Sequence, residues 1–184
     1  MCEGDTVQNI QRRTIDAPAA DVGALLDRLG TPQDQIWPSP AWSALHLDAG
    51  LAVGSRGGHG RIRYAVTEYE PGHRVRFAFA PGLGITGHHE FAVVPDGPMR
   101  CQIVHTAVGS TEGRMRLMWP LVIRRLHEAL LQDAFDNVQR AATGRAPRPA
   151  RRSPWVRLLR LALAPRQYTP DVPADDDGTV RPGR

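Results

Sequence analysis

Hydrophobic positions near the start of the chain change from a strand period to a helix period. Residues 7–15 predict a strand, and Asp16 and Pro18 favour a helix start directly after it. Asp can cap orphan backbone N–H groups, and proline in the first turn loses no hydrogen bond. The helix itself is predicted from an apolar i, i+3, i+4, i+7 stripe of Val22, Leu25, Leu26 and Leu29. Gly30 ends it, and residues 33–37 predict a second short helical piece.

The middle of the chain predicts a run of antiparallel strands. They cover residues 45–53, 61–69, 74–80, 85–94 and 99–109. The strands 61–69 and 74–80 form a hairpin with one apolar face and one face of arginines: Arg61, Arg63, Arg74 and Arg76. Because Glu68 and Glu70 lie close to them, we expect this arginine face to be solvated and not to bind nucleic acid.

The last regular element is a long helix over residues 117–143, with Pro120 in its first turn. Two adjacent apolar rows run along it: Val122, Leu126, Leu130, Ala134 and Val138, then Ile123, His127, Leu131 and Phe135. The order of elements predicts an α+β fold. An antiparallel sheet of six to seven strands wraps around the long C-terminal helix, with one or two short helices after the first strand.

Charge divides the chain near Gly144. All 23 basic residues are arginine; residues 1–144 hold 14 of them against 15 acidic residues, and residues 145–184 hold 9 against 4. The net charge is therefore −1 before the boundary and +5 after it, which argues against a basic nucleic-acid-binding globule. We expect a domain over residues 7–144 between flanking segments. These are a mobile N-terminus (1–6), an Arg/Pro-rich linker (145–154), a short amphipathic segment (155–164) and a disordered tail (165–184).

The amphipathic segment predicts contact with a partner, with its own domain or with an anionic membrane. Its candidate membrane contacts are Trp155, Arg157, Leu158, Leu159 and Arg160. We expect neither a membrane span nor a secretory signal, because no apolar run is long enough to span a bilayer and residues 1–5 are acidic and polar. With only Cys2 and Cys101, no disulfide framework is indicated, so we expect a cytoplasmic protein, peripheral to the membrane at most.

His89 and His105 are the first candidates for chemistry. His89 shares the apolar face of its strand with Phe91, and His105 shares the face of Ile103. A three-residue loop at 96–98 would place the two imidazoles opposite one another in an apolar cavity. Such a pair could act as a general base or a metal seat, or each imidazole could be a wall residue with a hydrogen-bond partner.

His59 and Tyr64 are the second candidates. His59 lies in a glycine-rich segment, 57–60, which we expect to form a loop at the mouth of the cavity above Tyr64. It could transfer a proton or anchor a ligand, or it could be a solvated loop residue. We expect no metal site, because Cys101 and His105 would lie about 13 Å apart on a strand. No cofactor is indicated.

Two segments of the chain resemble the START-like (SRPBCC) superfamily, whose arrangement is called the helix-grip fold. Residues 15–22 are similar to its join between first strand and first helix, and residues 68–77 to its central hairpin. With the long C-terminal helix, the resemblance covers residues 7–144. The superfamily includes polyketide cyclases, lipid-transfer domains and pollen-allergen proteins, and it has no shared catalytic motif.

The resemblance implies a cavity for a hydrophobic small molecule. The expected lining residues come from the sheet, the long helix and the segment after the first helix: Trp42, His59, Tyr64, Phe77, Phe79, His89, Phe91, Ile103, His105, Leu126, His127 and Leu130. Three functions stay open: binding or carriage of a lipid or polyketide-like molecule, a cyclase or dehydratase that uses cavity His or Tyr as acid and base, and a membrane-peripheral lipid-handling protein.

Overall fold

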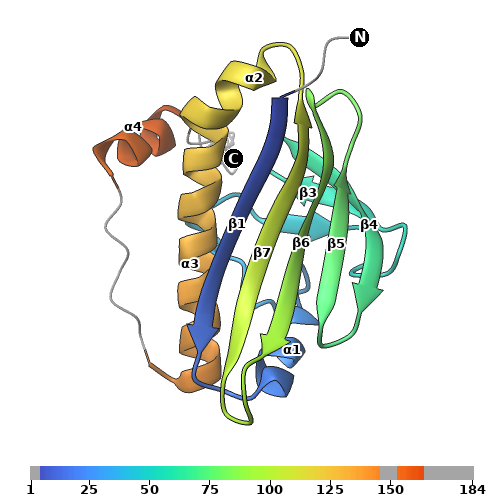
Figure 1. The fold of residues 1–184 in the computed structure, drawn as a ribbon, viewed down its shortest axis with the longest axis vertical. Helices are drawn as coiled ribbons and strands as arrows, with labels where there is room; N and C mark the ends of the chain where they lie inside the picture. The colour runs from blue at the N-terminus through green and yellow to red at the C-terminus, as the bar shows by residue number, and fades with distance from the viewer. Residues whose placement is uncertain (1–4, 146–152, 164–184) are drawn as a thin grey trace, which may run out of the picture.

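A seven-stranded antiparallel sheet forms the frame of the molecule (Figure 1). The computed structural model describes residues 5–145 and 153–163, so most of the expected N-terminus and linker, and the whole tail 165–184, lie outside the described residues. The strands are β1 (Asp5–Ile15), β2 (Leu45–Leu47), β3 (Arg56–His59), β4 (Ile62–Glu70), β5 (Arg74–Phe79), β6 (Ile85–Pro95) and β7 (Cys101–Thr111). Their order, β1-β7-β6-β5-β4-β3-β2, pairs the first strand with the last and leaves the sheet open.

One long helical element packs on this sheet and confirms the predicted α+β helix-grip architecture. It comprises α2 (Met115–Met118), a π-helical turn η1 (Trp119–Ile123) and α3 (Arg124–Thr143). The helical element begins two residues earlier than predicted, and Pro120 falls in the π-helical turn. Proline lacks an N–H and clashes with an α-helical carbonyl, so a wider turn is a common local solution.

Two shorter helices complete the described structure. Helix α1 (Ala19–Leu26) follows β1, and α4 (Pro154–Leu163) lies beside the N-terminal half of α3 (Figure 1). Among the described residues, no helix is long and apolar enough to cross a membrane.

The expected helical piece at residues 33–37 is wrong, because this segment is a turn. The carboxylate of Asp34 accepts hydrogen bonds from the backbone N–H groups of Gly30, Ile36 and Trp37. A short polar side chain that bonds nearby backbone in this way competes with helix formation. The expected strand 45–53 is likewise shorter: β2 ends at Leu47, and a turn leads to β3.

The predicted face of the second hairpin is correct, but its register is wrong. Five residues, 96–100, connect β6 to β7, where three were expected. His89 therefore lies opposite Ala107, and His105 lies opposite Phe91. The shift is an even number of residues, so both imidazoles still point to the interior.

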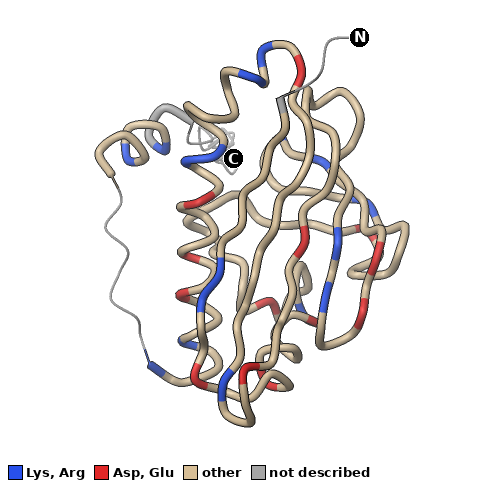
Figure 2. The backbone as a smooth tube through the Cα atoms, in the orientation of Figure 1, with Lys and Arg blue, Asp and Glu red and all other residues tan. Residues whose placement is uncertain are grey.

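On the arginine face of β4 and β5, the two arginines of β5 are paired with acidic residues, whereas Arg63 donates to the backbone carbonyls of Gly60 and Ile62. Arg76 contacts Glu68 and Glu90, and Arg74 contacts Glu68 and Glu70. Figure 2 shows these basic and acidic positions side by side on β4, β5 and β6. The side chains of this face are consequently a solvated ion-pair network on the outer surface of the sheet.

A row of polar contacts joins the edge strand β1 to α3. The amide of Asn9 donates to Glu128, and Gln132 donates to Gln11. Arg13 bonds to Gln132 and Asp136. A strand advances about 6.8 Å over two residues and a helix about 6.0 Å over four, so the two spacings match. This row, which we call the polar seam, aligns α3 with the sheet edge.

The apolar interior is divided into two clusters. The larger one packs α1 and the C-terminal half of α3 against the sheet, and it includes Leu130, Leu131, Ala134, Phe135 and Val138. The smaller one lies toward α2 and consists of Val7, Ile85 and Trp119 with partly buried neighbours. Along α3, Leu126 and His127 are only half-buried, whereas Leu130 and Leu131 are buried. The N-terminal half of α3 is therefore less closely covered than its C-terminal half.

Candidate functional site

A row of imidazole and aromatic rings crosses the interior between the sheet and the helical element. It runs from Trp37 to Trp119 through His59, Tyr64, His89, His105 and His127. Successive ring centroids lie 4.8, 6.0, 4.7, 5.4, 4.8 and 6.3 Å apart. We call this set the imidazole row. It brings together all four of the catalytic candidates expected from the sequence.

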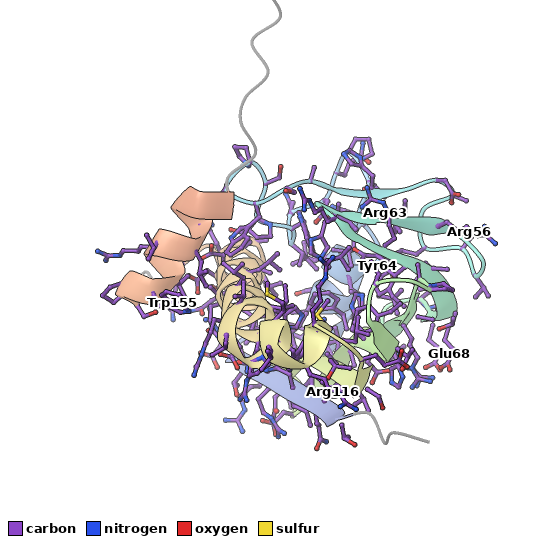
Figure 3. The ribbon with its side chains drawn as sticks, turned by 90° about the horizontal axis from the view of Figure 1, so that it is seen from above. Arg56, Arg63, Tyr64, Glu68, Arg116 and Trp155 are labelled. Atoms are coloured by element: carbon purple, nitrogen blue, oxygen red, sulfur yellow. The ribbon has the colours of Figure 1, made fainter. Side chains whose placement is uncertain are left out.

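Strand alternation places three members of the row. Tyr64 on β4, His89 on β6 and His105 on β7 occupy inward positions of neighbouring or next-neighbouring strands. Figure 3 shows Tyr64 within the molecule, with Arg56 and Glu68 at the periphery. Because of the register shift, His89 and His105 meet diagonally: Nε2 of His105 lies 3.4 Å from Nδ1 of His89.

His59 comes from a strand and not from the loop expected at 57–60. It belongs to β3 and pairs with Leu45 and Ile62. The glycines before it permit this arrangement, since a Cβ on Gly57 or Gly58 would lie 1.9 Å from a carbonyl oxygen of the adjacent strand. The ring of His59 is thereby held 4.8 Å from that of Trp37.

His127 enters the row from the opposite side, on α3. Its ring centroid is 4.8 Å from that of His105 and 6.3 Å from that of Trp119. His127 lies in the apolar helix row that the sequence predicts, so its inward position was expected. Trp37 and Trp119 were missed, although the position of Trp119 one turn before Ile123 was a usable signal.

Burial keeps the imidazoles uncharged at neutral pH. Desolvation, assisted by the proximity of the other histidines, holds the pKa values of His89 and His105 well below 6.5. Burial also lowers the pKa of His59 and that of His127 to about 4. The Tyr64 hydroxyl has its pKa raised by burial, so it stays protonated. The interior face therefore offers neutral donors and acceptors.

Two nitrogens of the row lack hydrogen-bond partners among the described residues. They are Nδ1 of His105 and Nδ1 of His127, both of which are shielded from solvent. Yet the His127 side chain as a whole is only half-buried, and the same holds for His59. Both residues are thus deep enough for desolvation to lower their pKa values, although neither residue is completely buried.

The remaining expected lining residues fall into three groups. Phe77, Phe91, Ile103 and Leu130 are buried in the larger apolar cluster. Phe77 and Phe79 also lie against His89, with centroid separations of 5.0 and 5.1 Å. Phe79 and Leu126 are partly buried. Trp42 lies away from the row: its indole N–H donates to Asp133, and the guanidinium of Arg160 lies over its ring.

The arrangement supports hydrogen bonding better than metal binding. Within residues 5–145 and 153–163, no group of three or more His, Cys, Asp or Glu side chains is placed to hold a metal ion. Glu128, the acidic residue that follows His127 in the sequence, is engaged with Asn9 and Arg124. Neutral imidazoles beside aromatic rings suit an apolar molecule that carries hydroxyl or carbonyl groups.

Comparison with known sequences places most of the chain in one family profile. The profile of the family described as "Polyketide cyclase / dehydrase and lipid transport" matches residues 8–143. No curated protein sequence matches the chain.

Several solved structures share the fold. Norcoclaurine synthase from Thalictrum flavum, in complex with dopamine and hydroxybenzaldehyde, is 15% identical, with a TM-score of 0.60 over 79% of this chain and 91% of that one. CalU16 from Micromonospora echinospora is 14% identical, with a TM-score of 0.54 over 88% and 92%. A Thermobifida fusca protein is 20% identical, with a TM-score of 0.54 over 73% and 94%. At such identities the likeness concerns the fold alone.

Proposed function

The chain belongs to the polyketide cyclase/dehydrase and lipid-transport family, and we propose that it binds a hydrophobic small molecule at the imidazole row. The molecule has an apolar body and at least one hydroxyl or carbonyl group. We place it between β6, β7 and the N-terminal half of α3, which is less closely covered than the C-terminal half. Binding or carriage, without chemical conversion, is the function that we favour.

The observation that carries this proposal is the pair of unpartnered nitrogens in the imidazole row. Nδ1 of His105 and Nδ1 of His127 are buried without a hydrogen-bond partner among the described residues. Leaving such a group unsatisfied costs about 1–3 kcal/mol. A ligand hydroxyl at this position would bond to one of them and recover that free energy.

The surroundings of these nitrogens favour an apolar ligand body. Apolar clusters lie on both sides of the row, and Phe79 and Leu126 beside it are only partly buried. The structure of norcoclaurine synthase contains dopamine and hydroxybenzaldehyde, which are phenolic compounds. A phenolic or polyketide-like molecule combines a flat apolar body with hydroxyl groups, and it is the ligand class that we propose here.

A matched pair of probes tests the proposal. We expect 1-naphthol to bind more tightly than naphthalene, because only the naphthol can bond to an imidazole nitrogen. Replacing His127→Phe should remove most of that difference, a loss of up to about tenfold for naphthol, with little change for naphthalene. His73→Phe, at an exposed position, is the control. Equal affinities of wild type for the two probes would contradict the proposed role of the row.

An acid–base function is the second candidate, and the contact between His89 and His105 is the observation in its favour. The two ring nitrogens are 3.4 Å apart, close enough to share a proton when one ring rotates slightly. However, burial leaves these imidazoles weak bases, and an efficient base has a pKa near the working pH.

Turnover of a polyketide-like substrate separates the two candidates. For a carrier, His89→Gln with His105→Gln should change ligand affinity by less than about tenfold, and no turnover should be detected with either protein. For an enzyme, the same double variant should lower turnover by about 10²–10⁴ while binding survives. The second result would replace carriage by catalysis as the function.

A further inference from the structure

We propose that an apolar surface shared by α2, η1 and α4 docks the protein on an anionic phospholipid membrane. The docking surface consists of five large side chains that are unusually exposed: Leu117 (70%), Met118 (40%), Leu121 (59%), Trp155 (49%) and Leu158 (56%). A set of large apolar side chains gathered at one place on a surface marks an interaction site. None of the five belongs to the imidazole row, so this proposal does not depend on the proposed ligand.

The five side chains form one surface although they come from two distant segments. The indole N–H of Trp155 donates to the backbone carbonyl of Leu121 at 2.9 Å, which joins α4 to the π-helical turn. Leu117 lies one turn before Leu121, and Leu158 lies one turn after Trp155. Figure 3 shows Trp155 on the outer side of α4, and Figure 1 shows α4 beside the end of the long helical element where α2 begins.

Helix α4 is fixed in place by its other side. Val156 and Leu159 are buried against the domain. The guanidinium of Arg160 donates to the carbonyl of Ala41 at 2.6 Å and lies 4.6 Å from the ring centre of Trp42. Of the membrane contacts expected from the sequence, Leu159 and Arg160 thus serve to hold α4, while Trp155, Arg157 and Leu158 remain exposed. The helix is therefore apolar on two faces, and only one of them is covered.

The docking surface is bordered mainly by basic residues, with Glu112 and Glu128 just beyond the two ends of the segment 113–127. Residues 113–127 and 153–163 together contain six arginines and no acidic residue. Four of these arginines, Arg114, Arg124, Arg125 and Arg157, are exposed. Arg124 and Arg125 contact Glu128, the nearest acidic residue along the helix. A large apolar surface bordered by arginines matches the headgroup region of an anionic bilayer, where both kinds of side chain are stabilised.

Other occupants fit this surface less well. Two copies of the chain would have to bring the same arginines together across a symmetric interface, which like charges oppose. The chain's own segment 164–184 carries Asp175, Asp176 and Asp177, whose charges complement arginine. However, this segment has few large apolar residues, too few to cover the five apolar side chains of the docking surface. An anionic bilayer offers both negative headgroups for the arginines and an apolar region for the five side chains of the docking surface.

Vesicle flotation of the full chain tests the proposal. We expect the wild-type protein to float with vesicles of equimolar phosphatidylcholine and phosphatidylglycerol, and not with phosphatidylcholine alone. Leu117→Ser with Leu158→Ser, and separately Arg125→Glu with Arg157→Glu, should each weaken partitioning by about tenfold or more. The matched controls are Val53→Ser with Met99→Ser, which are 66% and 65% exposed elsewhere, and Arg12→Glu with Arg28→Glu.

A second measurement reports insertion directly. Lipids with brominated acyl chains should quench the fluorescence of Trp155. Trp155→Phe should remove most of the quenching, because Trp37 and Trp119 are buried and Trp42 is half-buried beneath Arg160. The proposal is overturned if wild-type protein does not float with anionic vesicles, or if the docking-surface and control variants partition equally. The proposal is also overturned if light scattering shows that the wild-type protein is a dimer and that Leu117→Ser with Leu158→Ser makes it monomeric. The docking surface would then bind a second copy of the chain.

Discussion

His105 occupies a position that an apolar side chain would fill in an ordinary core. It lies between Ile103 and Ala107 on the inward face of β7, opposite Phe91, and it is 1% exposed. One of its ring nitrogens has no partner among the described residues. A leucine or phenylalanine there would avoid a cost of about 1–3 kcal/mol. A buried polar residue that costs stability is expected where function requires it, which agrees with the proposed ligand site.

Acidification should destabilise the protein through His59 and His127. Burial lowers the pKa of each imidazole to about 4, against 6.5 for the ordinary side chain. Between these two values the unfolded state binds more protons than the folded state, so the free energy of unfolding falls as the pH falls. As far as these two imidazoles are concerned, the free energy of unfolding is highest above about pH 6.5 and falls progressively as the pH falls toward about 4.

Urea unfolding of His127→Leu measures this effect. Between about pH 7.5 and about pH 5, the free energy of unfolding should fall less in the variant than in wild type, by about 1–2 kcal/mol. His46→Leu, at an exposed position, should retain the wild-type loss. If His127→Leu and wild type lose the same free energy between the two pH values, the imidazole is not desolvated in the folded state.

Gly23→Ala should destabilise the fold, although glycine to alanine normally stabilises a helix by about 1 kcal/mol. A Cβ at Gly23 would lie 2.3 Å from the carbonyl oxygen of Gly72, which is backbone and cannot turn aside. We expect a loss of about 2 kcal/mol or more in the free energy of unfolding. Ala24→Gly, at the next and exposed position, should lose only about 1 kcal/mol. A rise in Tm for Gly23→Ala would show that α1 and the β4–β5 turn are not in close contact.

At the scale of elements, period-two alternation predicted β4 correctly as far as its first half. Ile62, Tyr64 and Val66 share the inward face. A bulge after Val66 then shifts the register, and Tyr69 points toward α1, where its hydroxyl donates to Asp27 at 2.9 Å. An inserted residue of this kind leaves no trace in the alternation before it, so the contact could not be read from the sequence.

The candidate site was predictable in composition but not in geometry. Strand parity places His89 and His105 inside in every register that keeps both apolar faces inward, and the apolar rows of the last helix place His127 there as well. The loop length decides which residues meet, and 96–100 holds two residues more than the prediction allowed. The glycines around His59 predict a loop because they allow a tight turn and a close approach of a ligand, whereas here close strand contacts require them.

The polar seam should contribute to the stability of the sheet edge. Arg13 contacts Asp136, which is 9% exposed, and its guanidinium lies 5.9 Å from the ring centre of Phe135. Arg13→Met would leave that carboxylate buried without its partner, at a cost of about 1–3 kcal/mol. Arg12→Met, at the neighbouring exposed position, should stay within about 0.5 kcal/mol of wild type. Equal stability of the two variants in urea would show that the seam does not stabilise the fold.

At the scale of the whole molecule, one short segment connects the two proposed sites. The ring of Trp119 ends the imidazole row, 6.3 Å from His127, and it is 9% exposed. Leu117, Met118 and Leu121 on the same segment are exposed on the docking surface. The π-helical turn therefore has one side in the interior and the other toward the proposed membrane. Under the two proposals, a hydrophobic ligand would pass between bilayer and interior at this end of the molecule.

Two adjacent leucines of α4 should separate its attachment to the domain from its role at the membrane. Leu159 is 8% exposed, and Leu158 is 56% exposed. Leu159→Ser removes an apolar anchor and should release α4, because a helix of ten residues is marginal when it is not packed. Hydrogen exchange of the α4 backbone amides should then rise by about tenfold or more, with exchange in β6 and β7 unchanged. Leu158→Ser should leave exchange at the wild-type rate and reduce only vesicle binding. If Leu159→Ser left the exchange of α4 unchanged, the packing of Val156 and Leu159 would not be what holds the helix. The polar contacts of Arg160 and Trp155 with the domain would then be the attachments that hold it.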